Sequence, residues 1–106
     1  MMKNFFIILI SILSFIFNPY LANADNKLIN ALKFSDNFDL HKEAFIKHSK
    51  KILDSGKCSF EDFKENGGWA KATGSNAQKP VYFIYCGGFT LKDKLYLNIS
   101  NGKVWK

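Results

Sequence analysis

The spacing of apolar residues divides the chain into a helical first part and a strand-forming second part. Between residues 28 and 53, apolar positions recur every three or four residues, as on one face of a helix. After Gly68 the apolar positions alternate with polar ones, as in half-buried strands. The pattern predicts an α+β protein in which N-terminal helices pack on a small sheet.

Two longer helices are predicted in the first part. The first covers residues 25–34 and has Asp25 as its N-cap. The second covers residues 40–55 and has Asp39 as its N-cap. Gly56 suits the left-handed backbone position that follows a helix end. These residues therefore mark where the second helix begins and ends.

A third, short helix is predicted at residues 60–65. Ser59 and Asp62 have the spacing of a capping box, with Asp in the place where Glu is preferred. Phe60 and Phe63 lie three residues apart, so both face the same side of this helix. The short helix is expected to add aromatic side chains to the core.

Four strands are predicted in the second part of the chain. They lie within residues 68–73, 81–86, 94–100 and 103–105. Asn101-Gly102 is the strongest short hairpin signal in the chain, and a two-residue turn there would place Ile99 opposite Val104. Sequential strands joined by short loops predict a four-stranded antiparallel meander.

The first residues have the features of a cleavable signal peptide. Lys3 precedes an apolar run at residues 5–17, and Ala22-Asn23-Ala24 has the small residues that signal peptidase requires. This run is shorter than the roughly 20 apolar residues that cross a bilayer. Residues 1–24 are thus predicted to be a signal peptide, the alternative being an uncleaved anchor. Residues 25–106 are predicted to form one exported domain, periplasmic or extracellular, without a stable membrane anchor after cleavage.

The two cysteines of the chain, Cys58 and Cys86, are predicted to form a disulfide. An even number of cysteines in an exported protein is normally oxidised, and two cysteines allow one pairing. A loop of this length would stabilise the fold by about 3.5 kcal/mol on the chain-entropy model. The chain lacks the Cys-x-x-Cys spacing of redox-active pairs, so the expected role is structural.

The disulfide also orients the strand predicted at residues 81–86. Cys86 has to reach the helical layer, so residues that alternate with it, Tyr82 and Ile84, should face the helices. Phe83 and Tyr85 should then face outward. The same period places Tyr96 and Trp105 on the outer side of the last two strands.

Residue size indicates which side of the first strand faces the helices. Ala70 and Ala72 suit close contact with a helix, so Trp69 and Lys71 are predicted to face outward. The expected binding surface on the outer side therefore comprises Trp69, Lys71, Phe83, Tyr85, Tyr96 and Trp105. Exposed aromatic patches commonly bind partners, and Tyr and Trp often anchor interfaces. Two alternatives remain open: a loop or helix could cover this face, or a bulge at Gly87-Gly88 could reverse it.

The charged residues suggest a second kind of ligand. The chain has 15 lysines and no arginine, and without Lys3 the remaining 14 lysines exceed the nine acidic residues by five. Such a surface could bind anionic envelope glycans or lipid headgroups. The absence of arginine and the export signal argue against a nucleic-acid partner.

No residue pattern indicates catalysis, a cofactor or a metal. His41 and His48 are seven residues apart, about 10.5 Å along a helix, which is too far to share one ion. No Gly-x-Ser-x-Gly sequence is present. The predicted function is therefore that of an exported binding protein without catalytic activity, engaging an envelope or secreted protein. A small secreted hydrolase with dispersed catalytic residues is a further alternative.

Overall fold

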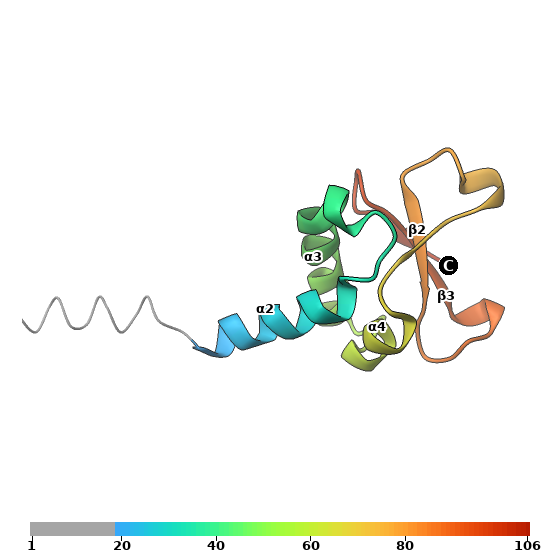
Figure 1. Cartoon of the computed structure of the whole chain (residues 1–106). Coiled ribbons are helices and arrows are strands. Elements are labelled where there is room, and N and C mark those ends of the chain that lie inside the picture. The colour runs from blue at the N-terminus through green and yellow to red at the C-terminus, as the bar shows by residue number, and fades with distance from the viewer. Residues whose placement is uncertain (1–18) are drawn as a thin grey trace, which may run out of the picture.

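Three helices and a four-stranded sheet form two layers in the computed structural model, which describes residues 19–106 (Figure 1). The helices lie on one side of the sheet and are α2 (Pro19–Leu32), α3 (Phe38–Ser55) and α4 (Phe60–Asn66). The strands are β1 (Ala70–Lys71), β2 (Val81–Tyr85), β3 (Lys94–Asn98) and β4 (Val104–Trp105). They pair antiparallel in the order β1-β2-β3-β4. The predicted α+β meander is confirmed.

Helix α2 begins earlier in the chain than the sequence pattern predicts. In the described part of the chain, this helix extends back to Pro19. Asp25 lies inside this helix, so its prediction as an N-cap is wrong. The predicted signal peptide lies outside the described residues as far as residue 18. Among residues 19–106, no helix is long and apolar enough to cross a membrane.

The ends of α3 and α4 follow local signals with one exception. Helix α3 starts after Asn37, whose backbone is left-handed at φ 59°, and Asp39 lies in its first turn rather than at its cap. Gly56 ends α3 at φ 79°, as predicted. The capping box of Ser59 and Asp62 is present at the start of α4, which confirms that prediction.

The hairpin between β3 and β4 is wider than predicted. Leu97, not Ile99, lies opposite Val104. The side chain of Asn98 accepts hydrogen bonds from the N–H groups of Ser100 and the following residue, which closes an Asx-type turn. Ile99 is buried and its N–H donates to a carbonyl next to β2. The register moves by two positions, so each residue keeps its predicted face.

The core lies between the helices and the inner face of the sheet. Phe45 from α3 packs edge-on against Tyr82 from β2, with ring centroids 4.9 Å apart. The strand residues Ile84, Leu95 and Leu97 are almost fully buried beside them. The inward positions predicted for β2 and β3 are therefore confirmed.

One disulfide joins the helical layer to the sheet. Cys58 lies between α3 and α4, and Cys86 lies directly after β2. Their Cα atoms are 5.0 Å apart, so the predicted pairing is confirmed. A disulfide is consistent with an oxidising, exported location.

Candidate functional site

The side of the sheet opposite the helices carries a continuous group of aromatic side chains. Phe83 pairs with Tyr96 across β2 and β3, and Tyr96 pairs with Trp105 across β3 and β4. Tyr85 follows two positions after Phe83 on the same face. We call these four residues the outer aromatic face. Their predicted outward orientation is confirmed, and all four are half-buried.

The rings of the outer aromatic face contact one another along the sheet. Phe83 lies 5.8 Å from Tyr85 and 6.4 Å from Tyr96, measured between ring centroids. Tyr96 stacks on Trp105 at 5.5 Å. Contacts of this kind stabilise aromatic pairs beyond the area that they bury. The four rings therefore form one ordered platform.

Two lysines lie over this platform. The Lys94 ammonium is 4.1 Å from the centroid of Phe83 and 5.2 Å from that of Tyr96. The Lys103 ammonium is 6.0 Å from the centroid of Trp105. These are cation–π distances. The surface is therefore both aromatic and positively charged, and neither lysine was predicted at the site.

Phe89 extends the outer aromatic face at one end and was also not predicted. Its ring lies 6.0 Å from that of Tyr85, and its side chain is 65% exposed. The signal for it was Gly87-Gly88, which lets the chain bend after the strand. A bend there returns the next aromatic residue toward the sheet.

Trp69 does not belong to this surface, so its predicted outward orientation is wrong. Its side chain is 1% exposed and lies among the helices. The indole Nε1–H donates to the Ser49 hydroxyl of α3 at 2.9 Å, and the ring contacts Phe63 of α4 at 5.8 Å. Its backbone N–H also donates to the Ser35 hydroxyl at 2.8 Å. Trp69 is a core residue whose polar atom has a partner.

Lys71 also faces the helices, contrary to the prediction. It pairs with the inward-facing Tyr82, and its ammonium lies 5.6 Å from that ring's centroid. The same ammonium donates to the carbonyl of Ala77 at 3.0 Å, which ties down the loop before β2. A strand of two residues has too few positions for its periodicity to reveal its inner face.

A hollow of about 470 Å³ opens at the Trp105 end of the outer aromatic face. We call it the hairpin hollow. Its lining comes from the loop before β2, the start of β2, and the β3–β4 hairpin. The lining residues are Asn76, Lys79, Val81, Asn98, Asn101, Lys103 and Trp105.

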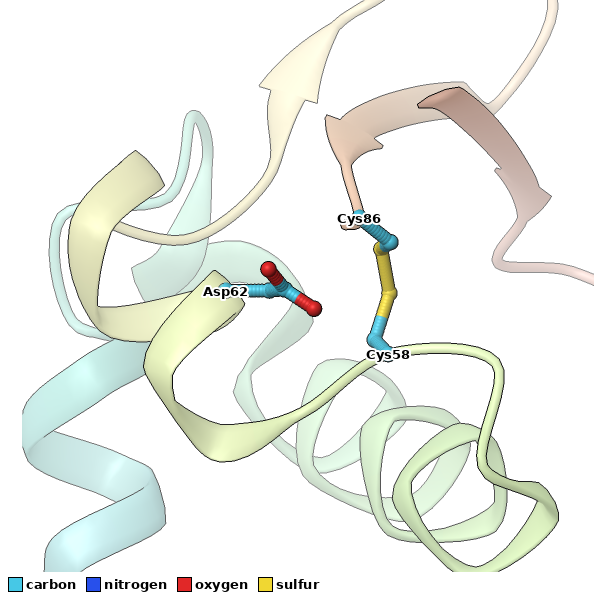
Figure 2. Close-up of side chains that lie close together, drawn as sticks. All are labelled: Cys58, Asp62 and Cys86. Atoms are coloured by element: carbon cyan, nitrogen blue, oxygen red, sulfur yellow. A yellow bond between two sulfur atoms is a disulfide. The ribbon is translucent and has the colours of Figure 1, made fainter. Parts of the chain in front are cut away.

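Asp62 lies beside the two disulfide sulfurs, and Figure 2 shows its carboxylate directed toward them. Both sulfurs are used in the Cys58–Cys86 bond, so this cluster does not offer thiolate ligands to a metal. The carboxylate accepts hydrogen bonds from the N–H groups of Ser59 at 2.8 Å and Gly87 at 3.1 Å. Burial raises the pKa of Asp62, but these hydrogen bonds outweigh it and hold the pKa below its ordinary value. The carboxylate therefore fastens the chain on both sides of the disulfide.

The two histidines, His41 and His48, are both half-buried. His41 contacts the rings of Phe45 and Tyr82. Burial lowers the pKa of His48, as do Lys47 and Lys51 to a smaller extent, while a hydrogen bond with the Ile99 backbone opposes them.

His48 and Glu43 line one hollow of about 380 Å³ between α3 and the hairpin. A histidine and a carboxylate therefore share this hollow, and within residues 19–106 no hydrogen bond joins the two side chains.

No known family model matches the chain, and no curated protein or solved structure is significantly similar to it. The candidate site therefore has to be interpreted from its own chemistry.

Proposed function

We propose that this protein is a small, exported binding protein without catalytic activity. Its partner is a protein of the cell envelope or of the surrounding medium, in the periplasm or outside the cell. The binding surface is the outer aromatic face with Lys94. The observation that carries the proposal is the unbroken set of ring contacts on the side of the sheet that the described helices leave uncovered.

The arrangement of this surface supports binding at low entropic cost. Half-exposed aromatic rings on a paired sheet are already held in place before a partner arrives, so little side-chain freedom is lost on association. Tyr, Trp and Phe are also the residues that most often anchor protein interfaces. The disulfide and the hydrogen bonds of Asp62 keep one end of β2 fixed to the helical layer.

The proposal is tested by capture with matched variants. The purified protein is used as bait for envelope and medium proteins, and any captured partner is then purified and titrated. We expect Phe83→Ala and Tyr96→Ala each to weaken the binding of that partner by roughly 30-fold, as for an interface hot spot. Phe34→Ala is the control, because Phe34 is 74% exposed and lies outside the sheet.

Circular dichroism and thermal melting establish that each variant is folded. The proposal fails if the folded Phe83→Ala and Tyr96→Ala variants bind the partner as tightly as the Phe34→Ala control. It also fails if the bait captures no specific partner from either source.

A further inference from the structure

The hairpin hollow combines an aromatic wall with hydrogen-bond donors. Trp105 supplies its apolar surface, and Tyr96 stacks behind Trp105 and holds that ring in place. Its volume of about 470 Å³ falls in the range of small-ligand sites, about 300–1,000 Å³. The hollow is therefore large enough for a small molecule or for one end of a polymer.

Two of the three side-chain amides that line the hollow have oxygens that already accept hydrogen bonds. The Asn98 side-chain oxygen already accepts from two backbone N–H groups of the hairpin. The Asn101 side-chain oxygen accepts from the N–H of Lys103 at 2.8 Å. These bonds orient both amides and leave their NH₂ groups available for a ligand.

The charged residues of the hollow also favour a ligand that accepts hydrogen bonds. Lys79 and Lys103 add two ammonium groups, which donate hydrogen bonds and accept none. None of the lining residues, all of which lie in the described part of the chain, is acidic. A matching ligand must therefore be rich in acceptors and negatively charged, and it needs an apolar face to lie on the indole ring.

We infer that the hairpin hollow binds an acidic saccharide, a sugar ring that carries a carboxylate or sulfate group. The C–H face of the ring lies on Trp105. The ring hydroxyls and the acidic group accept hydrogen bonds from Asn98, Asn101 and the two lysines. The hollow shares Trp105 with the outer aromatic face, but this inference requires no protein partner.

The test is an NMR titration of the protein with trigalacturonate. The molecule contains a built-in control, because its two indole N–H groups lie in different places. We expect the Trp105 signal to shift on binding, while the buried Trp69 signal, bonded to Ser49, stays unchanged. Maltotriose, a neutral saccharide, should bind at least tenfold more weakly because it lacks the negative charge.

A charge-matched pair of variants identifies the site. Asn101→Asp keeps the oxygen that accepts from Lys103 but replaces the donor with a negative charge, so trigalacturonate should bind at least tenfold more weakly. Asn30→Asp, at an exposed position of α2, changes the net charge equally and should leave binding unaltered.

Four results would overturn the inference. They are no binding of millimolar trigalacturonate, equal binding of maltotriose, equal affinities of the Asn101→Asp and Asn30→Asp variants, and a shift of Trp69 without a shift of Trp105. Phosphatidylglycerol vesicles form the remaining arm. Binding to these vesicles without binding to trigalacturonate would assign the basic surface to lipid headgroups and would equally refute the saccharide site.

Discussion

The two sides of the sheet carry similar side chains in different surroundings. On the inner side, Tyr82 is 2% exposed, packs against Phe45, and its hydroxyl accepts a hydrogen bond from Asn37 at 2.8 Å. On the outer side, Tyr96 is half-buried and contacts its aromatic neighbours and the Lys94 ammonium. The same residue type thus holds the fold together on one side and remains available on the other.

This comparison teaches that burial depth and polar partners separate core aromatics from candidate binding aromatics. Trp69 and Trp105 make the same point. The first has its indole N–H bonded inside the core, and the second lines an open hollow. Aromatic content alone did not distinguish the two.

The largest expected effect separates the two tyrosines. Tyr82→Ala removes a buried ring and should lower the free energy of unfolding by about 3–5 kcal/mol. Tyr96→Ala removes two cross-strand contacts at the surface and should cost about 0.5–2 kcal/mol. Urea unfolding of both variants measures the difference. Equal losses would show that the two sides of the sheet contribute alike to stability, contrary to the comparison.

The next effect concerns the bond that holds β2 against the helices. Replacing both cysteines, Cys58→Ala with Cys86→Ala, should lower the free energy of unfolding by about 3.5 kcal/mol, because the unfolded chain regains its freedom. Thermal melting compares the oxidised wild type with this variant and with the reduced wild type, whose free thiols are counted by titration. An unchanged melting temperature with free thiols would show that the disulfide does not stabilise this arrangement.

A smaller effect tests the polar partner of the inner tryptophan. Ser49→Ala leaves the Trp69 indole N–H without an acceptor in the core and should cost about 1–3 kcal/mol. Ser55→Ala on the same helix is the control, since Ser55 is exposed and should matter less. Chemical denaturation compares the two variants. If both variants have the same stability, the buried hydrogen bond between Trp69 and Ser49 does not stabilise the fold.

The smallest effect depends on pH and concerns the carboxylate beside the disulfide. The pKa of Asp62 is lower in the folded protein than its ordinary value of 3.8. The unfolded state therefore takes up its proton first, and the stability due to Asp62 is present above pH 3.8 and is lost as the pH falls through the folded pKa.

We expect Asp62→Asn to cost about 1 kcal/mol at neutral pH, mainly through the weakened cap of α4. The difference between wild type and variant should shrink as the pH falls below 3.8, as measured by denaturant unfolding at several pH values. If the difference in unfolding free energy stays constant down to the lowest pH, the folded protein does not stabilise the ionised form of Asp62.

The faces of β2 and β3 were predictable because each strand shows several alternations and Cys86 marks the inner side of β2. The capping box at Ser59 was predictable because all of its atoms lie within one helical turn. Strand β1 offered neither advantage, since it has only two residues and no covalent link. The small side chains of Ala70 and Ala72 suggested that these residues contact a helix. Trp69 makes that contact instead.

The hairpin between β3 and β4 also shows a limit of prediction from local sequence. Asn101-Gly102 correctly marked a turn, but the Asn98 side chain widened it, and Ile99 joined the core. The faces survived because a shift of two residues preserves the alternation. The hairpin hollow depends on this wider turn, so neither its donors nor its volume could be derived from local spacing.

By itself, the sequence determined the order of helices and strands, the antiparallel meander and the pairing of the cysteines. Those features follow from residue periodicity and from the presence of only two thiols. Tertiary structure alone decided that Trp69 and Lys71 turn inward and that Trp105 borders a hollow lined with donors. The reason is physical: periodicity shows which residues share a face, whereas burial depends on which distant side chains, such as Ser49, are there to meet them.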